Sequence, residues 1–406
     1  MTTAREAPRR AVAPGRAAIV AAVAVVVALG HYWYGNRHNY YDLRIYYDAI
    51  RWWAAGHPLY SFSHYDPIQG PLGFTYPPFA ALLMYPMAWV PVRVVVAVML
   101  LASFAALAVT TAWLVIPLAD RHGWPRWFVL GLALPLATAL EPIRETITFG
   151  QINLLLAVLV VGDLLRLVPR QSRWAGAGVG LATAIKLTPG IFIVYLLVTR
   201  RWRAAATAAG TATGATLLAA LVAPHESWRY WTFTVWQANQ VGHLDRIPNQ
   251  AVWGTLLRLA APHQPSRLVW LGLVALIAGY GLWRAARAAR AGDELVGMTL
   301  AGLVGVLISP VSWQHHLYWF LPAVVVLVDA AASPGRYRGW SAGLAAAVWL
   351  TVSVGVIASF DYGLSYRWLD TVPGFLISNW YLLLMLLLIP LLPFRVYRST
   401  CLVAPR

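Results

Sequence analysis

Residues 39–60 read NYYDLRIYYDAIRWWAAGHPLY, and the rest of the chain is organised around them. The stretch follows the first long apolar run and is rich in Tyr and Trp, whose amphipathic rings prefer the headgroup level of a bilayer. We therefore expect it to lie at a membrane surface. Its carboxylates Asp42 and Asp48 are functional candidates, because an ionisable group beside a bilayer is costly. For Asp48 a solvated loop position is the simpler explanation, whereas later parts of the chain favour a role for Asp42 in a site.

The composition indicates a membrane protein. Of 406 residues, 60% are hydrophobic and only 11% are charged, against about a quarter charged in soluble domains. The net charge of +16 comes from short arginine clusters between apolar runs, which is typical of cytoplasmic loops and predicts no nucleic-acid partner. The single cysteine, Cys401, excludes an internal disulfide. The apolar run over residues 17–30 is interpreted as an uncleaved signal-anchor.

The arginine distribution predicts the topology of a multi-pass, all-α protein in the plasma (inner) membrane. Arg5, Arg9, Arg10 and Arg16 place a tail, residues 1–16, in the cytoplasm. Residues 31–76 then form a long outer loop that ends at Pro77 and Pro78, where a helix is expected to begin. Further apolar runs at 79–91, 94–117, 127–140 and beyond give about twelve spans, with 120–150 the hardest region to divide, and a second cytoplasmic tail at 395–406. We expect one integral-membrane domain over 1–406.

One apolar run has an interruption. Residues 174–199 have arginines at both ends, so the chain must turn back within the run if both ends are cytoplasmic. Lys186, Thr188, Pro189 and Gly190 mark the turn, and such broken backbone is tolerated only inside protein or beside a cavity. Lys186 is also the only lysine in a chain with 30 arginines (31 − 1). A compact ammonium at that place suggests a phosphate ligand, although a lysine that snorkels to the interface is the alternative.

In this topology most polar residues share the outer face, whereas the inner loops hold little besides arginine. This asymmetry favours one large outward-facing site over a path through the membrane, since transporters keep their sites near the midplane between repeated halves and no repeat is found. The residues on the outer face are Asp42, Arg44, Arg144, Gln151, Asn153, Asn249, Gln250, Arg258, His315 and His316.

The available side chains suit transfer of a sugar from a lipid carrier. The chain has no HExxH, Walker or G-x-S-x-G motif. Outside the cytoplasm, activated sugars are carried on lipids. Displacement of a polyprenyl phosphate needs a carboxylate to deprotonate the acceptor and donors or cations to stabilise the departing phosphate. Asp42 is the candidate base, and the candidate phosphate ligands are Lys186, Arg44, Arg144, His315 and His316.

Several motifs, taken in order, carry a family resemblance: YYDLRIYYDAIRWWAAGHPLY, FTYPPF, FGQINLLL, ATAIKLTPGIF, PNQAVWGTLLR and SPVSWQHHLYW. They resemble glycosyltransferase family 87, the polyprenol-phosphate-mannose-dependent mannosyltransferases of the GT-C fold, found mainly in actinobacteria. The resemblance covers about residue 31 to the late spans. It implies that Asp42 matches the family's catalytic aspartate and that His315 or His316 contacts donor phosphate or acceptor. One departure is Ala251, where the family often has serine after Asn-Gln.

The other candidates have structural alternatives that remain open. For Asp48 a substrate-binding, structural or metal-binding role stays open beside the solvated position. Polyprenol-phosphate-sugar donors generally do without a metal, so we expect no metal and no cofactor. Adjacent histidines point different ways on a helix, so one is expected to face the site, with His316 favoured. Arg144 and Glu145 could pair with each other. The candidate substrate-binding residues, most of which could instead cap or tie helices, are Tyr46, Asp48, Trp52, Gln151, Asn153, Asn249, Gln250 and Arg258.

The resemblance and the chemistry together predict an inverting mannosyltransferase with its site on the periplasmic face. The expected donor is polyprenyl-phosphate-mannose, and the expected acceptor is a phosphatidylinositol mannoside or lipomannan, mannosylated through an α-1,2 linkage. Two alternatives stay open. The same fold could use another polyprenyl-phosphate sugar, such as arabinose or glucose, or the chain could transport a lipid-linked sugar.

Overall fold

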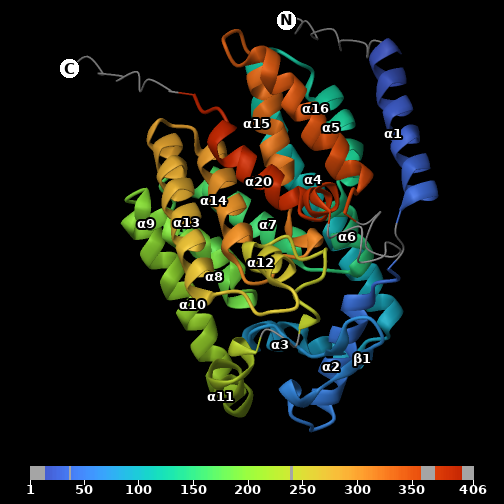
Figure 1. Cartoon of the computed structure of the whole chain (residues 1–406), viewed down its shortest axis with the longest axis vertical. Coiled ribbons are helices and arrows are strands. Elements are labelled where there is room, and N and C mark those ends of the chain that lie inside the picture. Colours follow the sequence, from blue (N-terminus) through green and yellow to red (C-terminus); the bar gives the residue numbers. More distant parts are fainter. Residues whose placement is uncertain (1–13, 36–37, 238–240, 358–370, 396–406) are drawn as a thin grey trace, which may run out of the picture.

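The described part of the chain is almost entirely helical. The computed structural model describes residues 14–35, 38–237, 241–357 and 371–395, and within them the only strands form one small hairpin (Figure 1). This confirms the expected all-α class. The expected cytoplasmic tails at 1–16 and 395–406 fall largely outside these residues, as does much of residues 361–379, a further loop that we expect on the outer face.

The chain order of the elements is as follows. The first half comprises α1 (Pro14–Tyr34), α2 (Tyr41–Ala54), β1 (His64–Asp66), β2 (Gly70–Leu72), α3 (Pro78–Met84), α4 (Val92–His122), α5 (Arg126–Ala139), α6 (Glu141–Phe149), α7 (Asn153–Gly162), α8 (Ala177–Ile185) and α9 (Ile191–Val198). The second half comprises α10 (Trp202–Val222), α11 (Pro224–Thr232), α12 (Val252–Ala260), α13 (Arg267–Arg290), α14 (Glu294–Ile308), α15 (Phe320–Ala332), α16 (Arg338–Val354), α19 (Val372–Ser378) and α20 (Trp380–Leu391).

Four of the described helices are long and apolar enough to cross a membrane: α1, α4, α10 and α13. Two bent pairs, α5 with α6 and α19 with α20, raise the number to six if each pair is one span. Twelve spans therefore stay a prediction. One reason for the lower number is that the apolar run 79–91 forms the 7-residue α3 and a short 3-10 turn, whereas a span needs about 20 helical residues.

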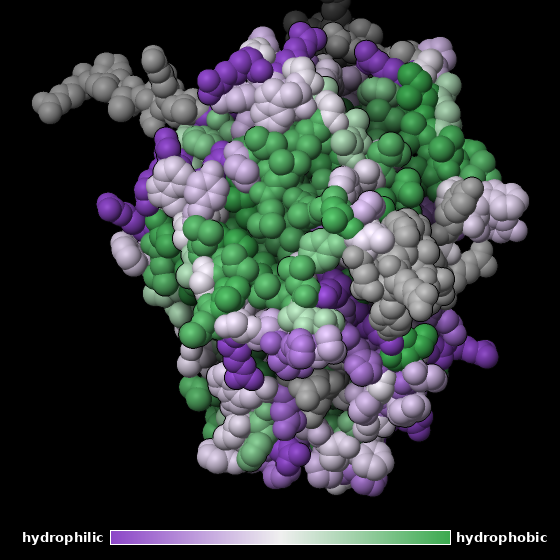
Figure 2. Space-filling model, in the orientation of Figure 1, coloured by the Kyte–Doolittle hydropathy of each residue, from purple (hydrophilic) through white to green (hydrophobic). Residues whose placement is uncertain are grey.

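The surface of the molecule agrees with a membrane setting. Figure 2 shows a broad hydrophobic area across the middle of this face, with hydrophilic residues gathered above and below it. In Figure 1, α2, α3, β1 and α11 lie together below the long helices. Of these elements, α2 and β1 belong to the expected outer loop 31–76, whereas α3 comes from the run 79–91 that was expected to span the membrane. The short, non-spanning elements of the described chain thus collect at one end.

The segment 31–76, expected as a loop, contains the end of α1, the helix α2 and the β1–β2 hairpin. In α2 the apolar side chains Leu43, Ile45 and Ile50 are buried, whereas Arg44 and Asp48 are exposed, so the helix packs one face against the protein. Asp42 and Tyr46 are four residues apart and share a face. The backbone of Tyr40 donates to the Thr148 carbonyl over 2.8 Å, which fixes the start of α2 against α6.

The run over residues 174–199 turns back where the sequence predicts. A Cβ at Gly176 would touch the Ala204 carbonyl and one at Gly180 the Ala208 carbonyl, so α8 runs in the same direction as α10. The helix α9 ends shortly before α10 begins, so it must run the opposite way. Lys186 lies at the C-terminus of α8, in extended conformation, directly before the turn. The turn therefore lies within the protein, level with the middle of α10.

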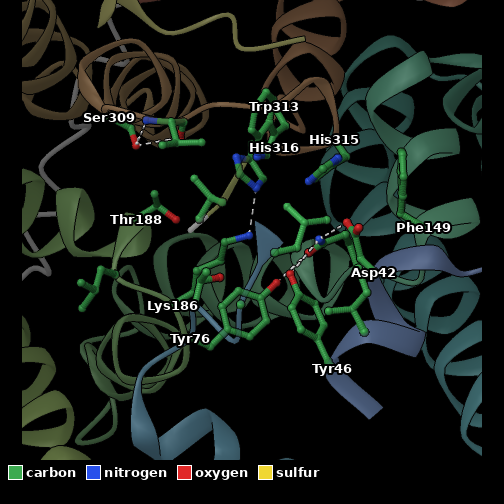
Figure 3. A pocket seen from close by; sticks show the side chains of 18 of the residues that line it. Asp42, Tyr46, Tyr76, Phe149, Lys186, Thr188, Ser309, Trp313, His315 and His316 are labelled. Atoms are coloured by element: carbon green, nitrogen blue, oxygen red, sulfur yellow. Dashed lines mark hydrogen bonds between the residues drawn. The ribbon is translucent and has the colours of Figure 1, made fainter. Parts of the chain in front are cut away.

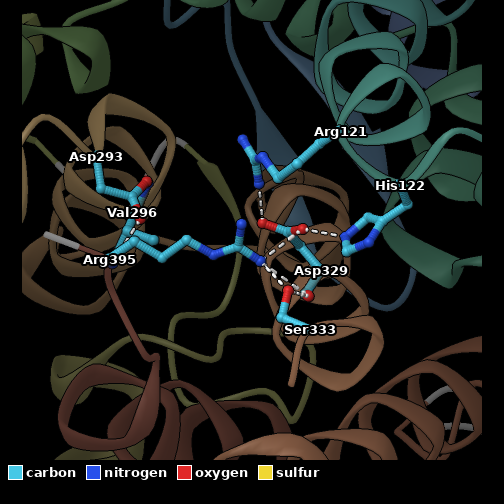
Figure 4. A network of polar contacts seen from close by, with 7 residues as sticks. All are labelled: Arg121, His122, Asp293, Val296, Asp329, Ser333 and Arg395. Atoms are coloured by element: carbon cyan, nitrogen blue, oxygen red, sulfur yellow. Dashed lines mark hydrogen bonds and ion pairs between the residues drawn. The ribbon is translucent and has the colours of Figure 1, made fainter. Parts of the chain in front are cut away.

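A network of charged residues ties together the ends of several helices away from this turn (Figure 4). The carboxylate of Asp329, on α15, pairs with Arg121 and with His122 Nε2 at 2.8 Å, both at the end of α4. Arg395 joins from beyond α20, 2.9 Å from the same carboxylate, and its backbone N–H donates to Asp293. Every oxygen of Asp329 thus has a cationic or hydrogen-bonding partner.

Candidate active site

A cavity of about 360 Å³ lies where the outer segments meet the turn after α8. Its walls come from α2, the loop after β2, the junction of α6 and α7, the turn after α8, the region of α11, and the loop between α14 and α15. Six of the candidate site residues line it: Asp42, Tyr46, Gln151, Lys186, His315 and His316. These positions span more than 270 residues of sequence, so only the fold brings them together.

Asp42 lies on the cavity wall and has one short polar contact (Figure 3). The Gln151 amide donates to its Oδ2 over 2.5 Å, and the same amide lies 3.3 Å from the Tyr46 hydroxyl. Tyr76 donates to Gln151 Oε1 over 2.7 Å, which orients the amide so that its N–H₂ group faces the carboxylate. Gln151 thus acts as a support for Asp42.

Gly150 allows this approach of α2 to the α6–α7 junction. Its φ of 72° is in the left-handed region, and a Cβ there would lie only 2.6 Å from Cβ of Leu43. Glycine is the residue that meets both conditions. The motif FGQIN thereby places Gln151 beside the first turn of α2.

The environment raises the pKa of Asp42 to about 6. Burial is the main cause, because it disfavours the charged carboxylate. The hydrogen bond from Gln151 and the ammonium of Lys186 act in the opposite direction. At neutral pH the group remains mostly ionised, yet it is basic enough to accept a proton from a hydroxyl in a reaction.

Lys186 lies across the cavity from Asp42, with its ammonium between α7 and the loop before α15. Its Nζ donates to Asn153 Oδ1 over 3.0 Å and lies 3.0 Å from His316 Nε2 (Figure 3). It also lies 5.2 Å from the centre of the Tyr76 ring, a cation–π distance. All of these partners are neutral groups, so within the described residues no carboxylate contacts the ammonium directly. Burial lowers the pKa of Lys186 to about 7, and the charge of Asp42 acts in the opposite direction. The positive charge of Lys186 is suited to an anionic ligand.

Both histidines line the cavity, contrary to the expectation that only one faces it. They belong to a 3-10 turn, Gln314–His316, and their rings are nearly perpendicular at 88° with centres 4.6 Å apart. A 3-10 turn has three residues per turn, so the two neighbouring rings differ in direction, yet both reach the cavity. The Asn153 amide and the Thr146 hydroxyl both hold the His315 carbonyl, at 2.8 and 2.9 Å.

The two imidazoles differ in their partners. Burial and the Lys186 ammonium lower the pKa of His316, so its ring is neutral and its Nε2 accepts from Lys186. The Nε2 of His315 is buried without a hydrogen-bond partner in the described structure. A buried polar atom of this kind costs free energy until a ligand or water pairs with it. The Nδ1 of His316 is likewise buried without a hydrogen-bond partner in the described structure, so each histidine has one ring nitrogen available to a bound molecule.

Three candidate residues on α2 lie away from the cavity. Arg44 is exposed and donates to Asn39 and not to Asp42, because it points to the opposite side of the helix. Asp48 is exposed on the same side. Trp52 stacks on His57 and donates to the Pro58 carbonyl, which ties the end of α2 to the following turn. The geometry gives these three side chains no contact with the cavity.

Four further candidate residues join the segments of the fold that surround the cavity. Arg144 donates to the carbonyls of Ala139 and Ser353, and its suggested partner Glu145 lies instead 2.5 Å from His38. The other three, each bonded to loop backbone or to Asn379, are Asn249, Gln250 and Arg258. Asn249 accepts from the Ser312 backbone over 2.9 Å, so this group positions the loop that carries the histidines.

Some residues at the site were not among the candidates. Tyr76, from FTYPPF, supports both Gln151 and Lys186, and the motif was quoted only as part of a series. Phe149, from FGQIN, lines the cavity, stacks on His38 and lies 5.5 Å from the His315 ring. The pair His38–Glu145 lies behind Phe149. Tyrosine and phenylalanine in an aromatic-rich chain have no sequence signal that separates site from core.

Within the described residues, no group of three or more His, Cys, Asp or Glu side chains is placed to hold a metal ion. The cavity instead combines a carboxylate, a hydrogen-bonded amide, an ammonium and two neutral imidazoles. This set can deprotonate a hydroxyl on one side and stabilise negative charge on the other. It therefore has the composition of a group-transfer site with an anionic leaving group.

Comparison with known proteins identifies the class. Residues 74–310, more than half of the chain, match the profile of glycosyltransferase family 87. The chain therefore belongs to glycosyltransferase family 87, a membrane family of the GT-C class. The matched residues include Tyr76, Gln151, Asn153 and Lys186, whereas Asp42 and the histidine pair lie outside them, which is a shorter stretch than the resemblance suggested.

Curated relatives are similar over most of the chain. A Mycobacterium tuberculosis protein, polyprenol-phosphate-mannose-dependent alpha-(1-2)-phosphatidylinositol mannoside mannosyltransferase, is 36% identical over 74% of this chain and 74% of its own. The Mycolicibacterium smegmatis protein of the same name is 33% identical over 77% and 76%. A phosphatidylinositol pentamannoside mannosyltransferase from M. smegmatis is 32% identical over 75% and 74%. No solved structure matches.

Proposed function

We propose that this chain transfers mannose from polyprenyl-phosphate-mannose to a hydroxyl of a mannosylated phosphatidylinositol lipid, through an α-1,2 linkage. The activities for which three relatives are named, at 32–36% identity over about three quarters of the chain, support the donor, the linkage and the acceptor class. The single structural observation that carries the proposal is that Asp42 and Lys186 face one cavity, with neutral partners around the ammonium.

The proposed reaction is one displacement at the anomeric carbon. Asp42 removes the proton of the acceptor hydroxyl as its oxygen bonds to the anomeric carbon of mannose. The bond from that carbon to the phosphate oxygen breaks, and its electron pair leaves with the polyprenyl phosphate. Lys186, with His315 and His316, stabilises the charge on the phosphate. A single displacement inverts the anomeric configuration, so a β-linked donor yields an α-linked product.

The other residues of the cavity have supporting roles in this scheme. Gln151 orients Asp42, and Asn153 positions Lys186 and the histidine loop. Tyr46, on the same face of α2 as Asp42, is placed to contact a sugar ring. No step of this scheme requires a metal. The cavity belongs to the end where the outer-face segments gather, so we place the reaction on the periplasmic face of the plasma membrane.

The test uses two aspartates on one helix. Mannose transfer from polyprenyl-phosphate-mannose to mannosylated phosphatidylinositol is measured with purified wild type, Asp42→Asn and Asp48→Asn, in the presence of EDTA. Asp42→Asn should lose about a hundredfold or more of kcat, the scale of a lost general base. Asp48→Asn is the matched control, because its carboxylate is exposed and away from the cavity, and it should retain wild-type activity.

Two results would contradict the proposal. Full activity of Asp42→Asn would reject the base, although the donor and acceptor could stand. Absence of wild-type transfer to every mannosylated lipid would reject the donor or the acceptor. Transfer of arabinose or glucose from the corresponding polyprenyl phosphates, in parallel reactions, would then identify a different sugar.

A further inference from the structure

A second, smaller cavity of about 60 Å³ adjoins the first one. The two have only Thr188 and His316 in common among their lining residues. We call the second one the apolar slot. It lies between α7, the turn before α9, α14 and the start of α15, and its wall includes Leu156, Ala157, Val160, Phe192, Val306 and Trp319.

The slot has a polar mouth and an apolar interior. Its only side chains with hydrogen-bonding groups at the Lys186 end are Asn153, Thr188 and His316, and two of these contact the ammonium directly at 3.0 Å. Beyond them the walls are mainly aliphatic and aromatic, and the further hydroxyl groups are those of Tyr318 and of Ser312, which donates to the Val306 carbonyl over 2.6 Å. The cation therefore lies where the polar cavity ends and the apolar slot begins.

Two glycines of α14 keep the slot narrow and allow the helices that form it to approach. A Cβ at Gly305 would lie 2.8 Å from Ile191 Cγ2, and one at Gly302 would overlap the Trp319 ring. Larger residues at these positions would push α9 and the start of α15 away. The slot is thus a narrow groove, and its width depends on the close approach of these helices.

The geometry of the displacement determines which part of the donor lies beside the apolar slot. In a displacement the incoming oxygen and the leaving oxygen lie on opposite sides of the anomeric carbon. Asp42 holds the incoming hydroxyl, so the leaving phosphate belongs on the side of Lys186. In Figure 3, Asp42 lies on one side of the Lys186–His316 contact and Thr188, at the mouth of the slot, lies on the other. The group attached to the phosphate must therefore continue away from Asp42.

We propose that the apolar slot binds the isoprenyl unit nearest the phosphate of the lipid donor. This inference rests on the proposed function, because it assumes a polyprenyl phosphate donor. The slot matches such a group in chemistry: a branched hydrocarbon attached to a phosphate fits an apolar groove whose mouth carries an ammonium. Leu187, in the turn, and Val194, on α9, do not line the slot, but they are exposed at 39% and 41%, so the surface near this turn is apolar and suits the rest of the lipid chain.

The first test fills the slot. Ala157, on α7, lines the slot and is 4% exposed, so Ala157→Phe places a ring in it. The apparent KM for polyprenyl-phosphate-mannose should rise about tenfold or more, the scale of losing an apolar binding pocket. The rate with mannosyl methyl phosphate, a donor without an isoprenyl chain, should not change. The control is Ala206→Phe, an exposed alanine on α10 outside both cavities, which should leave both donors unaffected.

The second test needs no substitution, so it tests the assignment of the slot even if Ala157→Phe does not fold. Wild type is labelled with a polyprenyl-phosphate-mannose that carries a photoreactive diazirine on its first isoprenyl unit, and the labelled peptides are identified by mass spectrometry. The label should fall on residues 156–160 of α7 and 302–306 of α14. A label confined to the far wall of the larger cavity, around Tyr230 and Val235, would overturn the proposal.

The outcomes separate this inference from the proposed function. If wild type transfers no mannose from polyprenyl-phosphate-mannose, the proposed function fails. If wild type transfers mannose but Ala157→Phe folds and keeps the wild-type KM for that donor, only the slot assignment fails. A rise in KM for both donors alike would also reject the slot, because it would indicate general damage to the site.

Discussion

Two charged clusters in this protein have opposite designs. At one end, Asp329 is surrounded by Arg121, His122 and Arg395, and every participant has a partner of opposite charge or a hydrogen bond. At the other, Asp42 and Lys186 face a common cavity, with a direct contact only to neutral side chains. Charges that satisfy each other join helix ends, whereas charges held apart around a cavity remain available to a substrate.

The difference has a physical cost. A buried charge without a counter-charge is expensive, and the burial of Asp42 raises its pKa to about 6. The protein tolerates this because Gln151, Asn153 and Tyr76 supply neutral hydrogen-bond and ring contacts. A buried carboxylate and a buried ammonium that face one cavity are a sign of function. The following predictions test the contrast, in order of expected effect on activity.

The largest expected effect on kcat/KM concerns Lys186. Lys186→Met should lower kcat/KM about a hundredfold, because one preorganised donor to developing charge has about that effect. Steady-state mannose transfer over a range of donor concentrations measures it. Arg44→Gln removes a charge of the same sign that lies outside the cavity, and it should change kcat/KM less than twofold. Equal losses in the two variants would mean that the cavity does not select the charge.

The pH dependence should report the carboxylate. A base with a pKa of about 6 is mostly ionised at pH 7 and mostly protonated at pH 5. Burial lowers the pKa of Lys186 to about 7, so this group becomes fully protonated over the same range and offsets part of the loss. The value of kcat/KM should therefore fall about fivefold between pH 7 and pH 5. The sign follows because activity needs the ionised form of Asp42, which is lost as pH falls. A pH profile of transfer by wild type measures this. The residual activity of Asp42→Asn should lack the limb, and a limb that persists would belong to another group.

An effect of similar size is expected for the support of Asp42. Tyr76→Phe removes the hydroxyl that donates to Gln151 Oε1, while the ring near Lys186 remains. The loss of one neutral hydrogen bond is worth about 1 kcal/mol, so kcat should fall about threefold to tenfold with little change in donor KM. The same transfer assay measures both parameters. A change confined to KM would instead assign the hydroxyl to substrate binding.

The paired cluster should affect stability and not turnover. Asp329→Asn removes the charge shared by Arg121, His122 and Arg395, and the apparent melting temperature of the purified protein should fall. Side chains of Arg121 and Arg395 are about a third exposed, at 35% and 30%, so water moderates the loss. At temperatures where the variant is folded, kcat should stay within about threefold of wild type. A large loss of kcat there would connect this end to the site.

Several features of the fold were predictable because they depend on local composition. The helix start at Pro78 and the break at Lys186–Gly190 follow from proline geometry and from arginines on both sides of an apolar run. The division into spans was less predictable, because hydropathy does not distinguish a crossing helix from a short one such as α3 that packs inside the protein.

The sequence by itself determined the class of this protein: its apolar composition demands helices in a membrane, and its ordered motifs match glycosyltransferase family 87. It also singled out Asp42, Lys186 and the histidine pair. Only the tertiary structure decided which candidates share a cavity. Arg44 is two residues from Asp42 but points to the other side of α2, whereas Gln151 is 109 residues away and donates to Asp42. Side-chain direction and contacts between distant segments depend on how helices pack, which no local pattern records.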